Sequence, residues 1–363
     1  MVIVHSRFLA RAALALVLII GCYLIFGPGF PLSPPPPRVK TETQKVPAPA
    51  PPPPPANPHH AYVFYATTNT YTCSALVNAH RLRNLFHTEQ PIYFLVGPDV
   101  THPAVAAIET SNLKIKVIHD VAPKAKEGSV AYYAQVLLKL RALRLHHVNP
   151  ALKRVLVLDA DQLIRKSLDH LFELPPVDVA APAMYWGDGL SVTTALMVAM
   201  LSEPLWKIID GALKNVRPDE YDMDIVNKVL QKRLMVLPGR YCTLNSHWEA
   251  ADLPGWFKGI KTSGNATDAE LVELYRQVEV LHFTAMGKPW KVAPERIVQD
   301  REYSGLSKVH PLFVEQFSEW HQDANKVCRG FWQFVEPPPP DSPPMEMPPP
   351  PPPAWEVGEP AVS

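Results

Sequence analysis

Short apolar runs alternate with longer amphipathic segments through the first half of the globular part of the chain. Apolar, β-branched and aromatic runs predict strands at 61–66, 92–96, 113–118 and 155–158. Apolar residues recurring on one face predict helices at 71–85 and 132–146. The polar turn 67–70 follows the first strand and can cap the first helix. This alternation predicts an α/β fold, with a parallel sheet covered by helices.

The second half of the chain shows a more irregular pattern. Apolar runs predict strands at 177–181, 195–198 and 278–283. Helical periodicity predicts helices at 203–213 and 224–232, and residues 287–290 are expected to form a loop after the last strand. We find no internal repeat, which argues against a solenoid or a propeller.

The run 155–158 is the centre of the pattern because two carboxylates, Asp159 and Asp161, follow it at once. Ligands of open α/β sheets bind beyond the carboxyl ends of the strands. Residues two apart on an extended chain point the same way, so these carboxylates are expected to repel unless a cation lies between them. Mg²⁺ and Mn²⁺ prefer carboxylate oxygen. The same Asp-x-Asp pattern also occurs as turn chemistry or as a helix N-cap.

Proline and one apolar run divide the chain into segments. The run 8–27 is apolar apart from Arg11, and basic residues precede it, which predicts a signal-anchor that follows a short cytoplasmic tail at 1–7. A cleaved signal peptide is the alternative. Proline is concentrated on either side of a catalytic or binding domain at 59–335. Residues 28–58 are expected to form an extended stem or a disordered segment, and 336–363 a disordered tail.

Charge and cysteine usage narrow the function classes. Lys plus Arg and Asp plus Glu both number 35, so the charge gives no indication of a nucleic-acid partner. Cys73, Cys242 and Cys328 lie in the globular part, which allows one disulfide and a free thiol, or no disulfide. Asn265 begins an Asn-Ala-Thr acceptor sequon that is usable only in a lumenal or extracellular domain.

Polar residues that follow three of the predicted strands suit one chemical task. They are Thr67 to Tyr71, Asp159 with Asp161, and His282 with Lys288. Two carboxylates and an imidazole can hold a divalent metal, and a lysine adds a point charge. Together they suit the binding of a diphosphate. Taken singly, His282 and Lys288 are as easily ordinary core or surface residues.

Four separated motifs resemble glycosyltransferase family 8, the glycogenin-like group, and most of all its fungal Golgi members of the N-acetylglucosaminyltransferase type. The resemblance covers about residues 61–292. Its motifs are Tyr65-Ala66-Thr67-Thr68-Asn69-Thr70-Tyr71, Lys139-Leu140 followed by the segment 154–161, Asp222-Met223-Asp224-Ile225-Val226-Asn227, and His282-Phe283 ending in Lys288-Pro289-Trp290. It implies a glycosyltransferase-A fold, with one mixed, mostly parallel sheet flanked by helices. It also implies a UDP-sugar donor and Mn²⁺, or Mg²⁺, as cofactor.

The resemblance also assigns roles to residues, position by position. Metal ligands are expected at Asp159, Asp161 and His282. Donor-binding residues are expected at Tyr65, Thr67, Thr68, Tyr71, Ala160 and Lys288, with Lys288 on the diphosphate. Asp222 and Lys139 are expected at the reacting sugar as catalytic residues. The chain departs from the family at Thr193-Thr194-Ala195, Met223 and Ala285, which puts the identity of the sugar in doubt more than the donor class.

We therefore expect a retaining glycosyltransferase. It would move a hexose or N-acetylhexosamine from UDP-GlcNAc or UDP-glucose to a glycan or glycoprotein acceptor, as a single-pass type II protein of the Golgi membrane. The acceptor would attack on the leaving-group face, or after a transient adduct with Asp222. Two other classes stay open: a non-catalytic lumenal lectin or scaffold on the same fold, and a metal-dependent hydrolase. The hydrolase would need a second metal cluster, for which the sequence offers no additional carboxylate–histidine set.

Overall fold

The computed structural model describes most of the predicted globular part. The described residues are 55–123, 135–187, 191–257, 265–298 and 309–334. The predicted tail 1–7, anchor 8–27, stem residues 28–54 and C-terminal tail 336–363 lie outside them. Within the described ranges, no helix has both the length and the apolar character needed to span a membrane.

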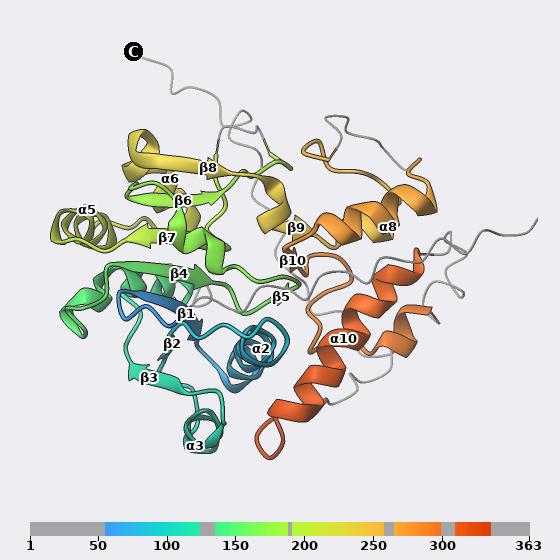
Figure 1. The fold of residues 1–363 in the computed structure, drawn as a ribbon, viewed down its shortest axis with the longest axis horizontal. Coiled ribbons are helices and arrows are strands. Elements are labelled where there is room, and N and C mark those ends of the chain that lie inside the picture. The colour runs from blue at the N-terminus through green and yellow to red at the C-terminus, as the bar shows by residue number, and fades with distance from the viewer. Residues whose placement is uncertain (1–54, 124–134, 188–190, 258–264, 299–308, 335–363) are drawn as a thin grey trace, which may run out of the picture. The chain divides into compact units, whose positions relative to one another are not determined.

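A seven-stranded sheet forms the centre of the fold, in the order β3-β2-β1-β4-β7-β6-β8 (Figure 1). The strands are β1 (His60–Ala66), β2 (Ile92–Val96), β3 (Ile115–His119), β4 (Arg154–Leu158), β6 (Val179–Pro182), β7 (Leu196–Met200) and β8 (Leu234–Leu237). β1 pairs in parallel with β2 and β4, β2 with β3, and β6 with β8. β7 runs antiparallel to β4 and β6. The expectation of a mixed, mostly parallel sheet is confirmed.

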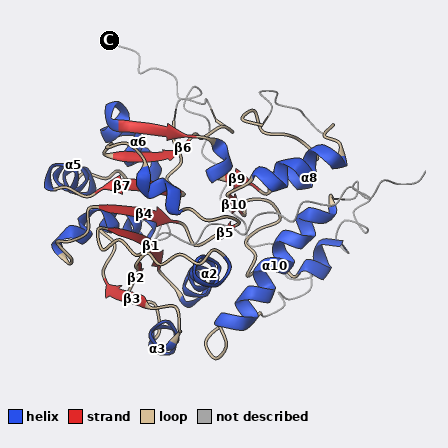
Figure 2. Ribbon diagram, in the orientation of Figure 1, coloured by secondary structure: helices blue, strands red, loops and turns tan. Residues whose placement is uncertain are grey.

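Helices cover both faces of this sheet. Alternate residues of β1 enter two different cores: Val63 packs with the first core and Phe64 with the second, and both side chains are fully buried. The first core includes α5 (Glu203–Leu213) and α6 (Asp222–Leu230), and the second includes α2 (Asn69–His80) and α3 (His102–Thr110) (Figure 2). Burial on both faces explains why the strand sequences are continuously apolar rather than alternating.

The segment before β4 differs from its prediction. The periodicity predicts an α-helix at 132–146, of which 132–134 lie outside the described residues. Leu137–His147 forms a 3₁₀ helix instead. Leu137, Leu140 and Leu143 are spaced by three residues, which matches the three-residue turn of a 3₁₀ helix and keeps all three buried. The apolar face is therefore predicted correctly, and the helix type is not.

A second, three-stranded sheet has the order β5-β10-β9, from β5 (Gln162–Ile164), β10 (Val280–His282) and β9 (Thr243–Leu244). A third core joins α2 to α7 (Ser246–Ala250), α8 (Asp268–Gln277) and α10 (Pro311–Val327). α10 packs against α2, and a disulfide links Cys73 to Cys328. Cys242 is a buried free thiol. The sequence leaves this pairing open, and the structure decides it.

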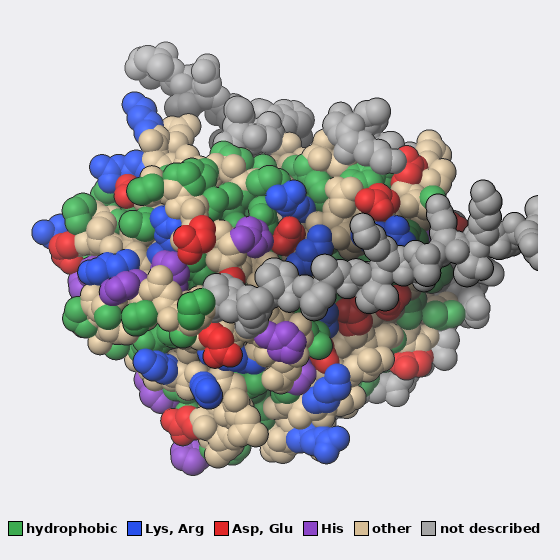
Figure 3. All heavy atoms as spheres, in the orientation of Figure 1, with side chains coloured by type: hydrophobic (Ala, Val, Ile, Leu, Met, Phe, Trp, Pro, Cys, Tyr) green, Lys and Arg blue, Asp and Glu red, His purple; other side chains and the backbone are tan. Residues whose placement is uncertain are grey.

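Other boundaries move by a few residues from the predicted ones. The predicted helix 71–85 is α2 followed by a π-helical turn, Arg81–Leu85. Thr68 is the N-cap of α2, but its side chain makes no capping hydrogen bond. Short 3₁₀ helices also form at Asp169–Glu173, Gln231–Arg233 and Gly239–Tyr241. On the face drawn in Figure 3, the described basic and acidic side chains are interspersed.

Candidate active site

A cavity of about 230 Å³ lies at the carboxyl ends of β1 and β4 and beside the start of α6. Most of the residues that the sequence assigns to a site line it: Tyr65, Thr67, Tyr71, Lys139, Asp159, Asp161, Asp222, His282 and Lys288. These side chains come from both halves of the chain. The predicted convergence of the carboxylate pair with His282 and Lys288 is therefore confirmed as geometry.

Backbone pairing of the small sheet brings His282 to Asp161. β5 begins directly after Asp161, and its first residue, Gln162, pairs with His282 of β10. The next amide along, at Phe283, donates a 3.1 Å hydrogen bond to the carbonyl oxygen of Asp161. The two residues are 121 positions apart in the sequence, yet adjacent strands fix their relative position.

Asp161 pairs with two cationic side chains. Its Oδ2 lies 2.6 Å from Nζ of Lys288 and 3.4 Å from Nε2 of His282. Burial alone would raise the pKa of Asp161, but the charges of His282 and Lys288 outweigh it and hold that pKa well below its ordinary value. Burial would lower the pKa of His282, and the attraction of Asp161 overcomes this and raises it to about 10.

Asp159 belongs to a second charged group, centred on Lys139. Nζ of Lys139 lies 2.7 Å from Oδ1 of Asp159 and 2.6 Å from Oδ2 of Asp222. Burial would lower the pKa of Lys139, but the two carboxylates outweigh it and raise that pKa. Burial raises the pKa of Asp159 to about 6, against the attraction of Lys139.

Two hydroxyl groups hold this second group in place. The hydroxyl of Tyr65 donates to Oδ1 of Asp159 at 3.1 Å. Oγ1 of Thr194 donates to Oδ2 of Asp222, and Lys139 donates to the carbonyl oxygen of Thr194 at 3.1 Å. Because Lys139 is only 3% exposed, its charge depends on these partners rather than on water.

The residues present fit a hard divalent cation in their chemistry. Two carboxylates and an imidazole are ligands that Mn²⁺ accepts. The ion pairs with the two lysines are made by Oδ1 of Asp159 and Oδ2 of Asp161. Asp159, Asp161 and His282 do not form a group whose ligand atoms all lie within 4.8 Å of one another. The lysines neutralise the two carboxylates in this arrangement.

Two of the predicted donor-binding residues do not line the cavity. Thr68 is the N-cap of α2, and its carbonyl oxygen accepts from the hydroxyl of Thr72 at 3.0 Å. Ala160 is buried, and its carbonyl oxygen accepts from Oγ of Ser74 at 2.6 Å. Both residues lie in motifs whose neighbours do reach the cavity, so position in a motif alone does not identify the side chains that line it.

Sequence reasoning missed other residues of the site. Gln135, Val136 and Tyr221 also line the cavity. Sγ of Cys242 lies 3.5 Å from Nδ1 of His282, on the ring edge opposite Asp161. Tyr221 directly precedes Asp222, so its place beside a predicted site residue is visible in the sequence. Cys242 is far from every motif, and only the strand pairing of β9 with β10 brings its neighbourhood to His282.

A second cavity, of about 220 Å³, adjoins the first and shares Thr67 and Gln135 with it. Its wall is mostly apolar and comes from the segments that follow β2 and β3. The other lining residues are Gly97, Pro98, Asp99, Val121, Ala122, Pro123 and Leu138. The site thus combines a charged chamber with an adjoining apolar one.

Comparison with known proteins finds distant relatives. No family model matches the chain. The chain is 22% identical over 249 residues to glucose N-acetyltransferase 1 of Gibberella zeae. This alignment covers 63% of the chain and 53% of the relative. The chain is 23% identical over 270 residues to the Aspergillus fumigatus protein of the same name, which covers 66% of this chain and 67% of the relative. The chain therefore spans about half the length of the first relative.

Solved structures with a related backbone include the galactosyltransferase LgtC in complex with donor and acceptor sugar analogues. That structure is 18% identical to this chain, with a TM-score of 0.49, and the match covers 74% of this chain and 96% of that one.

Proposed function

We propose that the chain is a glycosyltransferase that moves a hexose or N-acetylhexosamine from a UDP-sugar, UDP-GlcNAc or UDP-glucose, to a glycan or glycoprotein. The observation that carries the proposal is the convergence of Asp159, Asp161, His282, Lys139 and Lys288 in one cavity. The names of the two relatives, which describe transferases acting on glucose, support a sugar-related transfer reaction. We further propose that the reaction depends on Mn²⁺ and retains the anomeric configuration of the donor.

Lys288 is proposed to bind the donor diphosphate. Its side chain is 29% exposed and lines the cavity, so a phosphate oxygen can replace the carboxylate of Asp161 as its partner. Asp159, Asp161 and His282 would hold the Mn²⁺ ion, which when bound supplies positive charge to the diphosphate. Exchange of partners by Lys288 would free Asp161 for that role and place a cation beside the leaving group.

Asp222 is proposed to act at the sugar. Lys139 and Thr194 fix its carboxylate at the cavity wall. A fixed negative charge stabilises the positive charge that develops on a sugar ring as its bond to the leaving group breaks. We prefer attack by the acceptor on the leaving-group face, with Asp222 as electrostatic stabiliser. Lys139, which contacts both Asp159 and Asp222, is then the residue that links the two ends of the donor site.

The uracil ring is proposed to occupy the adjoining apolar cavity. A planar base needs apolar walls with a few polar groups at the rim. Leu138 and Ala122 supply such walls, and Gln135, which donates to Asp99 at 3.3 Å, supplies polar atoms at the boundary between the two cavities. Together the two cavities support a donor with a diphosphate and a planar base.

The proposed location is the lumenal side of the Golgi membrane, with residues 8–27 as a type II anchor. Two observations support a lumenal domain. The Cys73–Cys328 disulfide is of a kind that forms in oxidising compartments. Asn265 is exposed at the start of its sequon, so the acceptor side chain is accessible.

The proposal is tested by measuring UDP release and sugar transfer from a panel of UDP-sugars with Mn²⁺, using the full chain. The Asp161→Asn variant is the matched loss-of-site control, and Asp219→Asn, at a 76% exposed position, is the matched surface control. We expect turnover of UDP-GlcNAc or UDP-glucose that needs Mn²⁺ and falls by about a hundredfold or more in Asp161→Asn only.

The alternatives predict different results in the same assay. A lectin or scaffold would bind sugar without releasing UDP from any donor. Acetyl-CoA is added to the panel because the name of the relatives describes acetyl transfer. Turnover of acetyl-CoA but of no UDP-sugar would overturn the proposal.

A further inference from the structure

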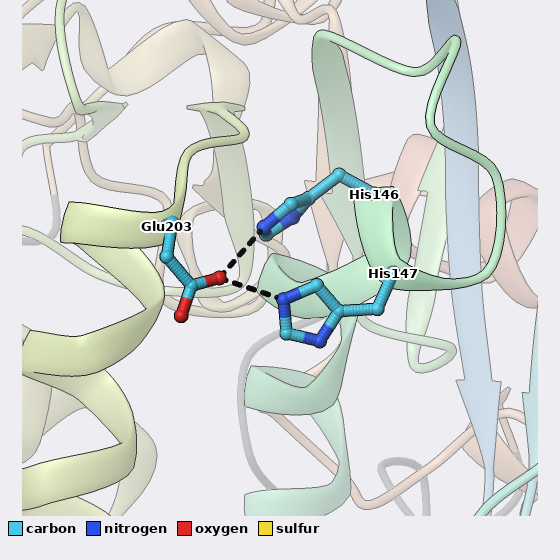
Figure 4. Close-up of side chains that lie close together, drawn as sticks. All are labelled: His146, His147 and Glu203. Carbon is cyan, nitrogen blue, oxygen red and sulfur yellow. Dashed lines mark hydrogen bonds and ion pairs between the residues drawn. The ribbon is translucent and has the colours of Figure 1, made fainter.

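A cluster of two imidazoles and one carboxylate lies outside the cavity. His146 and His147 end the 3₁₀ helix before β4, and Glu203 is the first residue of α5. Figure 4 shows both rings turned toward one carboxylate oxygen. Oε2 of Glu203 lies 2.8 Å from Nε2 of His147 and 3.6 Å from Nε2 of His146. Among the described residues, this is the group of three potential metal ligands whose ligand atoms all lie within 4.8 Å of one another.

The cluster lies near the opposite end of strand β4 from the cavity. Arg154, which begins β4, pairs with Met200, which ends β7. The segment that precedes β4 and the segment that follows β7 therefore meet at this end of the strands. Asp159 follows the other end of β4, roughly 16 Å away for a strand of this length. An ion bound at the cluster would be separate from the candidate active site.

His146 carries polar atoms that the protein leaves unsatisfied. Both of its ring nitrogens are shielded from solvent and have no hydrogen-bond partner among the described residues. At 3.6 Å, the contact of Nε2 with Glu203 is an ion-pair separation rather than a hydrogen bond. A buried polar atom without a partner is costly, and an ion is one of the usual ways in which such an atom is satisfied.

The separations suit a tetrahedral metal centre. Metal–nitrogen and metal–oxygen bonds of about 2.0–2.2 Å place two ligands of a tetrahedral ion about 3.3–3.6 Å apart. The His146–Glu203 separation of 3.6 Å already matches, and the His147–Glu203 separation of 2.8 Å needs a small outward movement. His147 and Glu203 have side chains that are 44% and 50% exposed, so they can move, and water can reach a fourth position.

Electrostatics at helix ends explains only part of this arrangement. A histidine in the last turn of one helix and a glutamate in the first turn of another are each favourable with the helix dipole. That accounts for the His147–Glu203 pair. It does not account for the unsatisfied Nε2 of His146, which a metal ion would engage.

We propose that His146, His147 and Glu203 bind a divalent transition-metal ion, with Zn²⁺ the best match to two imidazoles and one carboxylate. The ion ties the end of the 3₁₀ helix to the start of α5. Both helices pack in the first core, so the site stabilises the sheet at the end of strand β4 that lies opposite the cavity.

The proposal is tested by titrating Zn²⁺ alone into the metal-free full chain by calorimetry. All proteins carry Asp161→Asn, which removes a candidate ligand from the cavity. His147→Ala and Glu203→Gln are the test variants, and His102→Ala, which removes an exposed imidazole at the start of α3, is the matched control. Thermal melting with and without Zn²⁺ provides a second readout.

We expect one Zn²⁺ per chain, bound with equal affinity by the parent and the His102→Ala control. His147→Ala and Glu203→Gln should each weaken binding by about tenfold or more. The melting temperature should rise with Zn²⁺ only where binding is retained, because a ligand that binds the folded state stabilises it. Unchanged affinity in both test variants, or no binding to the parent, would overturn the proposal. Glu203→Gln keeps the size of the side chain, so it serves if His147→Ala does not fold.

Discussion

Lys139 lies at the wall of the candidate active-site cavity and places its ammonium nitrogen 2.6 Å from Oδ2 of Asp222, with its side chain only 3% exposed to solvent. The same nitrogen is 2.7 Å from Asp159. One buried cation therefore holds a candidate metal ligand and a candidate catalytic carboxylate together. Without the ammonium group of Lys139, the two carboxylates would repel each other in a buried environment.

Replacement of Lys139 by methionine should destabilise the protein. Methionine is similar in length but leaves Asp159 and Asp222 buried without a compensating charge. We expect the free energy of unfolding to fall by about 3–5 kcal/mol, measured by urea denaturation. Lys214→Met is the matched control: Lys214 is 72% exposed and lies 2.6 Å from Asp210. Its loss should cost less than about 1 kcal/mol. Equal effects of the two variants would contradict the role given to Lys139.

Asp222→Asn should reduce kcat rather than donor affinity. The asparagine keeps the shape of the side chain but removes the charge proposed to stabilise the developing positive charge on the sugar. We expect kcat to fall by about a hundredfold or more, with KM for the donor changed by less than about threefold. Asp224→Asn, two residues along α6, serves as the control because its carboxylate caps the amide of Tyr221 at 2.9 Å. A rise in donor KM with kcat intact would assign Asp222 to binding instead.

Glu220 should make stability depend on pH. A hydrogen bond from Lys228, at 2.8 Å, and one from the amide of Arg217 lower the pKa of Glu220 below its ordinary value of 4.5. A lowered pKa in the folded state gives stability that is present above pH 4.5 and is lost as the pH falls through the folded-state pKa.

Glu220→Gln removes this contribution. The free energies of unfolding of the wild type and the variant should therefore differ most near pH 7, and the difference should shrink below pH 4.5. Urea denaturation between pH 3 and pH 7 measures this. A difference that is constant over this range would show that the charge of Glu220 is not what stabilises the fold.

Asn265 should carry an N-linked glycan when the full chain is expressed in a eukaryotic secretory pathway. The side chain is exposed and begins the sequon Asn-Ala-Thr. We expect an endoglycosidase to increase the gel mobility of the wild type, and Asn265→Gln to abolish the shift. An unmodified protein in the same host would contradict the proposed lumenal topology if its domain were also accessible to added protease on the outside of intact vesicles.

The sequence predicts those parts of the fold that depend on local pattern. The continuous apolar runs of β1 and β4 identify strands buried on both faces, and the amphipathic period of α5 gives its bounds correctly. The short strands β5 and β9 have too few residues to show a period. They form because β10 pairs with both of them, which is a relation between distant segments.

The residues of the candidate site fall into the same two groups: some have a local signal in the sequence, and others are placed by contacts between distant segments. Asp159, Asp161 and His282 are predictable because each directly follows or ends an apolar run. The two lysines are also predicted as site residues, Lys288 by its place after the last strand and Lys139 by the family resemblance. Their pairing with the carboxylates is not predictable, because only the structure shows the side chain of Lys139 enclosed between Asp159 and Asp222. Cys242 gives no signal in the sequence, since its contact with His282 is a product of the small sheet.

The disulfide has a consequence for how the protein is made. Cys73 must stay reduced on the nascent chain until Cys328 has been synthesised, 255 residues later. At ribosomal rates of about 5–20 residues per second, that takes roughly 13–50 seconds. Cys242 emerges 86 residues before the correct partner, so an oxidising environment offers the wrong thiol first. Early burial of Cys242 beneath the small sheet would protect maturation from that error.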